Sequence, residues 1–311
     1  MKDYIKSIPL PIAGLMLGLA ACGNLVSSYG LIFKYICGFF SFSILFLLIF
    51  KIILLPKVVS KELENPIVNS VFLTLPMAVM ILSTYIIKFH YTMAFLIWSL
   101  GLGLHILLLI DFTKKYILNF NMTKVFPSYF IVYAGIVVGS ITCVPYKLQH
   151  IGKIIFYFGL TSYIILLPIV IYRLIKLKIT KEPAMPTVLI MAAPGSLCLA
   201  GYLSSFSHKN ETLVYGLLGL SLLMTLYALI RSIKLLSLRF YPSYSAFTFP
   251  FVISAIAMKK SIGYLTSLNV NTTILKYIFK IEELFAISMV FYVLILYMIN
   301  HRKSITCSIS K

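Results

Sequence analysis

The stretch that decides the fold class is residues 31–54, LIFKYICGFFSFSILFLLIFKIIL, which carries charge only at Lys34 and Lys51. A helix rises about 1.5 Å per residue and the apolar layer of a bilayer is about 30 Å thick, so a helix of this length crosses it. Backbone polar groups in lipid must be bonded within the segment, which favours a helix. The stretch lacks the alternating polarity of a membrane β-barrel strand. The sequence therefore predicts a transmembrane helix here.

Nine further apolar stretches of similar length fill the chain. Of its 311 residues, 60% are hydrophobic and 11% are charged, against roughly 25% charged in a soluble domain. The mean hydropathy is +1.00. We expect an all-α integral membrane protein whose residues 1–311 form a single transmembrane transporter or channel domain. The ten predicted helices are 9–27, 31–54, 67–88, 91–111, 125–144, 151–172, 187–206, 211–232, 241–263 and 279–299.

Positive charge alternates between the connections. Among the 27 lysines and arginines, about twice as many fall on the side of the two termini as on the other side, and every arginine is on that side. The positive-inside rule then places both termini in the cytoplasm, with the chain in the plasma membrane. The formal charge of +19 follows from this rule and from attraction to anionic lipids. We therefore expect the lipid bilayer as a partner and no nucleic acid.

Proline and glycine gather in the odd-numbered predicted helices, whereas Pro168 is the one proline inside an even-numbered helix. Proline removes a backbone hydrogen bond and kinks a helix, and small residues let helices approach closely. We expect kinked inner helices that surround a pore and a smoother outer layer that faces lipid. The alternative explanation is that proline and glycine are common in membrane helices in general. The predicted pore-lining or kink residues are Pro11, Gly14, Gly18, Pro76, Gly135, Gly139, Pro194, Gly195 and Pro250.

Acidic residues are scarce, and their scarcity indicates which kind of ion the predicted pore would carry. There are 8 of them, all in connections or near the ends of predicted helices. Intramembrane carboxylates mark cation paths and proton relays, so their absence argues against both. Glycine backbone, hydroxyls and helix N-termini supply partial positive charge, which suits an anion. No cluster of acid–base or nucleophilic groups is present, so we predict neither an enzyme nor a cofactor or metal site.

Four motifs, in order along the chain, resemble the tellurite-resistance/dicarboxylate transporter family. They are residues 7–18 (SIPLPIAGLMLG), 126–130 (FPSYF) followed by Gly135, Pro186-Thr187 followed by 193–195 (APG), and 246–250 (AFTFP). This family includes bacterial tellurite-resistance proteins and plant guard-cell slow anion channels. The resemblance implies ten helices in five hairpins around a central pore lined by the odd-numbered helices. It also implies a homotrimer, and a phenylalanine plug that corresponds to Phe249.

The residues around Phe249 agree with a role as pore gate. Phe249 directly precedes Pro250, where a kink would turn its ring toward the pore axis, and an apolar ring in a narrow pore blocks ions by sterics and dewetting. Ordinary packing is the alternative, because the chain has 23 phenylalanines. Lys259 and Lys260 follow two to three turns later. They would either attract anions to the outer mouth or extend toward lipid headgroups.

Two functions stay open from the sequence. The first is passive, channel-like transport of small anions of the dicarboxylate, sulfite, tellurite or halide type. The second is a proton-coupled secondary carrier of anions or dicarboxylates. A carrier needs a titratable group on the path, and His105 is the one histidine in the middle of a predicted helix. The other role for His105 is a contact between helices. Asn24 would either line the outer half of the pore or bond a neighbouring helix.

Overall fold

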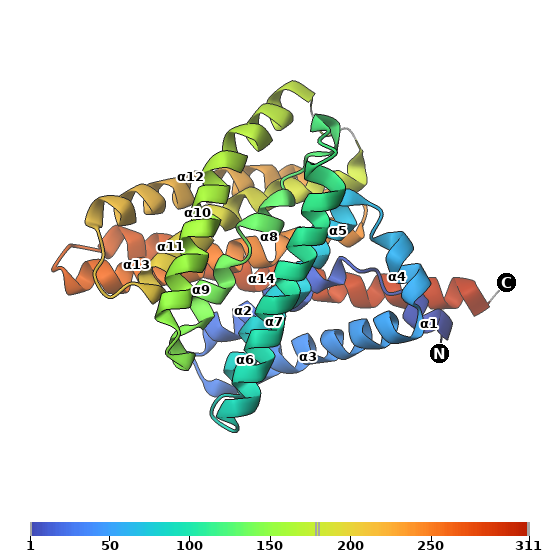
Figure 1. Cartoon of the computed structure of the whole chain (residues 1–311), viewed down its shortest axis with the longest axis horizontal. Helices are drawn as coiled ribbons and strands as arrows, with labels where there is room; N and C mark the ends of the chain where they lie inside the picture. The colour runs from blue at the N-terminus through green and yellow to red at the C-terminus, as the bar shows by residue number, and fades with distance from the viewer. Residues whose placement is uncertain (1, 178, 180, 310–311) are drawn as a thin grey trace.

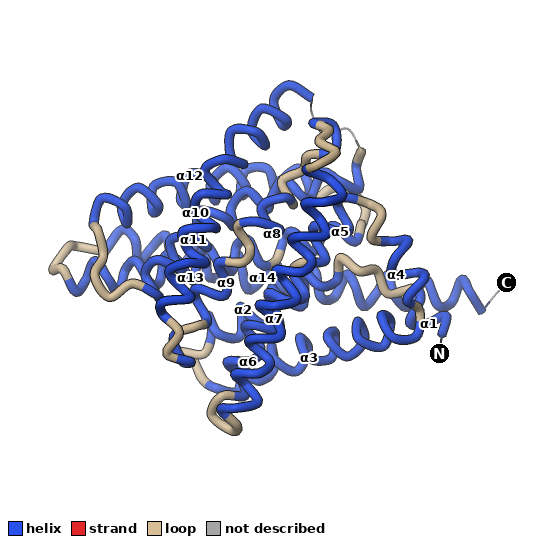
Figure 2. Tube along the Cα trace, in the orientation of Figure 1, coloured by secondary structure: helices blue, strands red, loops and turns tan. Residues whose placement is uncertain are grey.

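The computed structural model describes residues 2–177, 179 and 181–309, and within them every regular element is a helix (Figure 2). The α-helices are α1 (Lys2–Lys6), α2 (Ile12–Val26), α3 (Leu31–Leu54), α4 (Pro56–Glu62), α5 (Pro66–Phe72), α6 (Thr74–Ile86), α7 (Tyr91–Phe112), α8 (Tyr129–Tyr133), α9 (Val137–Thr142), α10 (Gln149–Tyr172), α11 (Ala192–Ser205), α12 (Glu211–Leu235), α13 (Phe249–Ser267) and α14 (Thr273–Ile309). Short 3₁₀ or π turns are η1 (Thr113–Ile117), η2 (Met122–Lys124), η3 (Val144–Tyr146), η4 (Arg173–Leu177), η5 (Glu182–Met191) and η6 (Pro242–Phe247).

Seven helical stretches among the described residues are long and apolar enough to cross a membrane. They are Leu31–Leu54, Pro66–Ile86, Tyr91–Ile117, Gln149–Leu177, Glu182–Ser205, Glu211–Leu235 and Thr273–His301. Helix α2 is apolar but shorter. The prediction of an all-helical, multi-pass membrane protein is therefore confirmed.

The long unbroken helices α3, α7, α10, α12 and α14 form the outside of the molecule. In the most apolar window of each, one third of the residues or fewer are buried, against 83% for Pro66–Ile86 and 94% for Glu182–Ser205. Their exposed side chains are large and apolar, such as Phe39, Leu100 and Ile233. A continuous apolar surface of this kind fits contact with lipid.

The buried interior consists of five shorter, interrupted segments: α2, α5–α6, α8–α9, η5–α11 and η6–α13. Each packs against the outer helix that follows it, as α2 does against α3 and α11 against α12. The inner segments also contact one another in a closed series, from α2 to α6, α9, α11, α13 and back to α2. We call this series the inner ring.

Both termini lie at the same side of the molecule, on the right of Figure 1. We call the end of the molecule that carries the α3–α4, α7–η2, α10–η5 and α12–η6 connections the termini face, and the opposite end the far face. Lys51, in the last turn of α3, is fully buried. Its Nζ donates to the Ile8 carbonyl oxygen at 2.5 Å and contacts Glu62 Oε1 at 2.6 Å. The ion pair joins α3 to α4, and the hydrogen bond to Ile8 ties both to the chain that precedes α2.

Candidate functional site

Four prolines of the inner ring stand where an α-helix begins. Pro11 is the N-cap of α2, Pro76 and Pro194 are the third residues of α6 and α11, and Pro250 is the second residue of α13. The first turn of a helix has no backbone acceptor for its N–H groups, so proline there sacrifices no hydrogen bond. These prolines thus start new helices after a break, which differs from the bends in continuous helices expected from the sequence.

Two cavities lie along the inside of the inner ring. The cavity nearer the termini face, here the termini-side cavity, has a volume of about 30 Å³ and receives side chains from all five inner segments. The far-side cavity has a volume of about 480 Å³ and is lined by α2, α6, α9, η3 and α13. About one water molecule fits the first cavity, whereas the second is a vestibule of ligand size.

Phe249 is shared by the linings of these two cavities. It is 5% exposed and, among the described residues, it is the only one that lines both cavities. Thr248 before it has φ −100° and ψ −88°, outside the helical range. The Thr248 Oγ1 lies 2.7 Å from the Ser245 carbonyl oxygen and 3.1 Å from that of Gly14. The hydroxyl therefore satisfies backbone groups at the break and fixes the start of α13 against α2.

Glycines let α2 approach this break closely. A Cβ atom built on Gly18 would lie 2.6 Å from the Thr248 Cβ and 3.2 Å from the Phe249 nitrogen. One built on Gly14 would lie 2.8 Å from the Ser245 Cβ. Both distances to a Cβ are shorter than real side chains tolerate, so these positions require glycine for packing.

The residues predicted to line the pore or kink its helices divide into two groups. Gly14, Pro194 and Pro250 line the termini-side cavity together with Phe249. The rest line neither cavity: Pro11, Gly18, Pro76, Gly135, Gly139 and Gly195. A Cβ built on Gly135 would lie 2.0 Å from the Ile131 carbonyl oxygen and 2.8 Å from the Met77 sulfur, and one on Gly139 would lie 3.0 Å from Ile155, whereas one on Gly195 would make only ordinary contacts.

The first turns of four α-helices meet at the termini-side cavity. Gly14, Thr74, Ala193 and Phe249 belong to the first turns of α2, α6, α11 and α13, and all four line it. Helix N-termini carry about half a positive charge. The cavity is lined without charged side chains among the described residues, so its positive potential would come from backbone dipoles alone.

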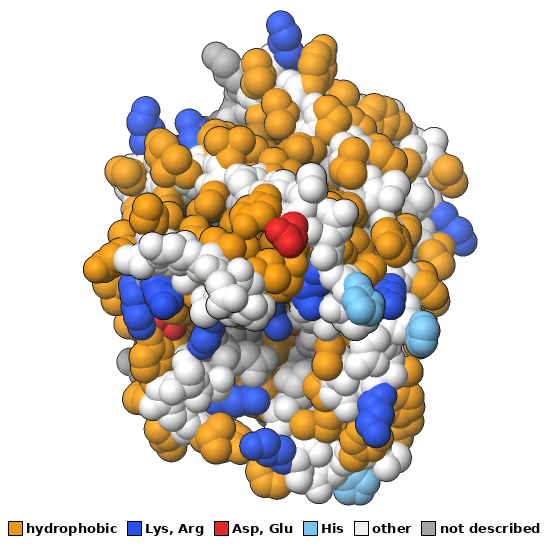
Figure 3. Space-filling view, turned by 90° about the vertical axis from the view of Figure 1, so that its left-hand side faces the viewer, with side chains coloured by type: hydrophobic (Ala, Val, Ile, Leu, Met, Phe, Trp, Pro, Cys, Tyr) orange, Lys and Arg blue, Asp and Glu red, His pale blue; other side chains and the backbone are white. Residues whose placement is uncertain are grey.

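Fixed positive charge lies instead in the far-side cavity, where Lys259 and Lys260 both contribute to the lining. Lys259 Nζ donates to the Leu25 carbonyl oxygen at 3.2 Å and to Ser28 Oγ at 2.8 Å. Asn24 lines the same cavity. Viewed from the left of Figure 1, basic side chains surround a hollow in the surface and acidic ones are sparse (Figure 3).

His105 lies outside both cavities. It is fully buried on α7, and its Nε2 is 3.0 Å from the Val132 carbonyl oxygen of α8. The side chain thus joins an outer helix to an inner segment. This position fits the contact between helices considered above better than a place on the path.

Two buried carboxylates were missed by the sequence interpretation, which placed them near a helix end. Because α14 begins at Thr273, Glu282 lies about 14 Å along the helix. Glu282 is 6% exposed and its Oε2 accepts a hydrogen bond from Ser254 at 3.1 Å. Glu283 is 4% exposed and its Oε2 accepts one from Tyr29 at 2.6 Å. Neither lines a cavity of the inner ring.

No group of three or more His, Cys, Asp or Glu side chains in the described part of the chain could hold a metal ion. Residues 8–301 match the family model described as voltage-dependent anion channel (SLAC1). This match covers all of the inner ring and the outer helices α3, α7, α10 and α12. Among curated proteins, none matches the chain significantly.

Proposed function

The chain belongs to the voltage-dependent anion channel (SLAC1) family, and on that premise we propose that it conducts small anions through a pore closed by Phe249. Family membership confirms the resemblance inferred from the four sequence motifs. It makes the protein a membrane anion transporter and not an enzyme. The proposed pore is the axis of the inner ring, within ten helices arranged as five hairpins.

The observation that supports this proposal is that Phe249 lines both cavities. A benzyl ring across a narrow apolar passage excludes water, and an ion cannot cross without losing its hydration. The ring is attached at the first residue of α13, next to a backbone break. A small rotation at Thr248 would therefore move the ring without unfolding a helix.

The charge distribution supports anions as the transported species. Four helix N-termini would stabilise an anion beside Phe249, and Lys259 and Lys260 would raise the anion concentration in the far-side vestibule. No carboxylate lines either cavity among the described residues. Dicarboxylate, sulfite, tellurite and halide ions are the candidate substrates.

The orientation and assembly belong to the same proposal. The excess of lysine and arginine in the termini-face connections supports a cytoplasmic termini face in the plasma membrane. A homotrimer with one pore in each subunit follows the family resemblance, and the far face would then be the external entrance for anions.

A proton-coupled carrier is the competing function, and one observation keeps it testable. Glu282 is a buried carboxylate that bonds Ser254, which lies on α13 between Phe249 and Lys259. A carrier would use this group or His105, although neither of them lines a cavity of the inner ring. Coupling would make transport saturable and dependent on a pH gradient.

The test is anion current from the purified full-length protein in planar bilayers, with chloride, nitrate, sulfite and malate. We expect little current from the wild type and a large anion-selective current from Phe249→Ala. Phe251→Ala is the matched control, because Phe251 is also buried on α13 but packs against Phe285 at a ring distance of 4.8 Å. Equal currents from both variants would refute the gate. Slow, pH-driven uptake with no current would favour the carrier.

A further inference from the structure

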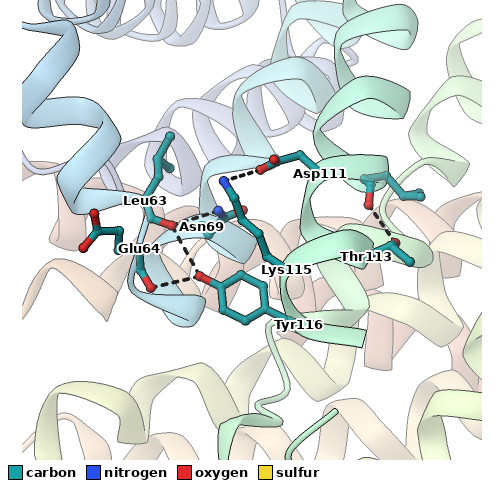
Figure 4. Close-up of polar contacts among 8 residues, drawn as sticks. Leu63, Glu64, Asn69, Asp111, Thr113, Lys115 and Tyr116 are labelled. Atoms are coloured by element: carbon teal, nitrogen blue, oxygen red, sulfur yellow. Dashed lines mark hydrogen bonds and ion pairs between the residues drawn. The ribbon is translucent and has the colours of Figure 1, made fainter. Parts of the chain in front are cut away.

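Several polar groups outside the inner ring serve as ties between segments. At the termini face, the Tyr116 hydroxyl lies 2.9 Å from the Glu64 carbonyl oxygen and 3.4 Å from that of Leu63, and Asn69 Nδ2 donates to the latter at 2.9 Å (Figure 4). These contacts hold η1 against the connection between α4 and α5. A pair of buried thiols near the far face is different, because it borders an open pocket.

Cys22 and Cys37 line one pocket of about 390 Å³, which we call the dithiol pocket. Its walls come from α2, the turn that follows α2, α3 and α14. Both cysteines are free thiols, and they are 0% and 2% exposed. Tyr29 and Phe33, which also line the pocket, are exposed. The thiols therefore lie at the bottom of a pocket that opens to the outside of the molecule.

The two thiols are neighbours because α2 and α3 cross closely at this point. A Cβ atom built on Gly23, next to Cys22, would lie 3.0 Å from the Cys37 Cβ and 3.0 Å from the Lys34 carbonyl oxygen. The side chains of Cys22 and Cys37 are close enough to hydrogen-bond. Glycine at position 23 thus allows two helices to bring their sulfur atoms to one place.

The rim of the dithiol pocket is fixed by a polar cluster. The Tyr29 hydroxyl donates to Glu283 Oε2 at 2.6 Å, and Lys280 Nζ donates to the Tyr29 hydroxyl oxygen at 2.5 Å. These bonds attach the connection between α2 and α3 to α14, since Glu283 and Lys280 lie on that helix. The pocket is thus preformed, and a ligand would not have to order its walls.

The surroundings favour a ligand that binds both sulfur atoms and leaves no charge. Apolar side chains such as Phe33, Ile36 and Phe291 form much of the wall. A bare thiolate in such a site would lose its hydration, and a thiolate at Cys22 would also be repelled by the Glu283 carboxylate. A monovalent soft metal ion between two thiolates would leave a net negative charge, so it fits this site less well.

We propose that the dithiol pocket captures an organic arsenic(III) oxide, R–As=O, as a neutral adduct with Cys22 and Cys37. Both S–H bonds and the arsenic–oxygen double bond break, and two arsenic–sulfur bonds form. The two thiol protons pass to the oxygen, which leaves as water. Arsenic stays trivalent, so the step needs no oxidant or reductant. Sulfur is the soft ligand that such a centre prefers, and the apolar walls would cover the organic substituent.

The adduct would tie an inner segment to an outer helix. Cys22 lies on α2 one turn after Gly18, the glycine that packs against Thr248 at the start of α13. Cys37 lies on α3. Because the two thiols are brought together only in the folded protein, the bridged adduct should stabilise the folded state and raise the melting temperature.

The experiment mixes the reduced, purified full-length protein in neutral detergent with phenylarsine oxide. Intact-mass spectrometry counts the bound arsenic, and thermal unfolding gives the melting temperature. Cys22→Ala and Cys37→Ala each leave one thiol in the pocket, and Cys22→Ser and Cys37→Ser repeat the test with a polar side chain of similar size. The melting temperature without arsenical shows that each variant is folded. The matched control is Cys198→Ala, which removes a fully buried thiol of α11 outside the pocket.

We expect the wild type and Cys198→Ala to bind one phenylarsenic group and to melt at a higher temperature. Each single-thiol variant should bind about a hundredfold more weakly, because the second sulfur acts at a high effective concentration. Dithiothreitol should remove the arsenical, and 2-mercaptoethanol at the same thiol concentration should not. Tight binding by the single-thiol variants, its loss in Cys198→Ala, or removal by the monothiol would overturn the proposal. The readout involves no transport, so a failure of the anion-pore proposal would leave this result unaffected.

Discussion

Replacing Gly18 with alanine tests whether the close approach of α2 positions Phe249. The added Cβ would lie 2.6 Å from both the Cβ and the Oγ1 of Thr248. The Thr248 Cβ cannot rotate away, because the backbone fixes its position. Reaching an ordinary contact of 3.4 Å requires a movement of about 0.8 Å, and the Phe249 nitrogen, at 3.2 Å, would move with its neighbour.

The size of the effect follows from overpacking. Forcing an extra carbon into a tightly packed site costs about 1 to 3 kcal/mol. At about 2 to 4 °C per kcal/mol, the melting temperature of Gly18→Ala should fall by about 2 to 12 °C. Because the start of α13 is pushed away from α2, the passage beside Phe249 should also widen, and the resting anion current should rise.

The matched control is Gly219→Ala in α12, where a built Cβ meets no atom within 4 Å. Alanine is the better helix former at such a site, so this variant should be neutral or more stable by up to about 1 kcal/mol. Thermal unfolding of both purified proteins and their currents in planar bilayers give the comparison. If Gly18→Ala has the same melting temperature as Gly219→Ala and the same anion current as the wild type, then the close approach of α2 does not position Phe249.

Three further predictions concern charged residues. Lys260→Gln should lower anion conductance by about fivefold at an ionic strength on the order of 0.01 M, and by little at 1 M, where charges are screened. Lys259→Gln should lower the conductance less, because the Lys259 Nζ already donates hydrogen bonds to Leu25 and Ser28. Glu282→Gln should leave anion current and its pH dependence unchanged, and loss of pH-driven uptake in flux assays would instead support the carrier. Lys51→Met should lower the free energy of unfolding by about 2 to 4 kcal/mol in denaturant titrations, since it leaves the Glu62 carboxylate without its ion-pair partner. The double variant Lys51→Met/Glu62→Gln should recover part of that lost stability.

The outer helices were predictable because their hydropathy alone determines where they lie in the sequence. Residues 31–54 and 91–111 are predominantly apolar, and the structure gives α3 as Leu31–Leu54 and α7 as Tyr91–Phe112. Burial of a long apolar helix in lipid needs no information about its neighbours. Hydropathy alone therefore located these helices to within a residue or two.

The interior was harder to predict because its breaks depend on contacts between distant segments. Residues 125–144 form two short helices, α8 and α9, rather than one. The break before α13 is stabilised by the Thr248 hydroxyl and by Gly14 and Gly18 of a helix more than 200 residues away in sequence. Proline marks the neighbourhood of such a break, but only the tertiary partners decide whether the helix bends or restarts.

The buried carboxylates show a different limit. Hydropathy placed the last helix at 279–299, so Glu282 and Glu283 fell near its start. In the structure α14 begins at Thr273, whose nitrogen donates to Asn271 Oδ1 at 3.0 Å. The Asn-Thr-Thr sequence is a helix-start signal that could have extended the prediction by two turns. Hydrogen bonds from Ser254 and Tyr29 compensate the burial of the two acids, and no local pattern announces those partners.

If Phe249 is the gate proposed above, the separation of fixed charge from it has a consequence for transport. Lys259 and Lys260 follow Phe249 on α13 by about 15 Å of helix rise, so they can concentrate anions in the vestibule without holding one at the constriction. At Phe249 itself, the helix N-termini supply only partial charges on backbone groups. A full charge in so apolar a passage would bind an anion tightly and slow its release, since conduction requires sites that an ion also leaves easily. An Ala246→Lys variant, which adds a cation to the lining of the termini-side cavity, should therefore increase anion binding while lowering the current that opens in Phe249→Ala.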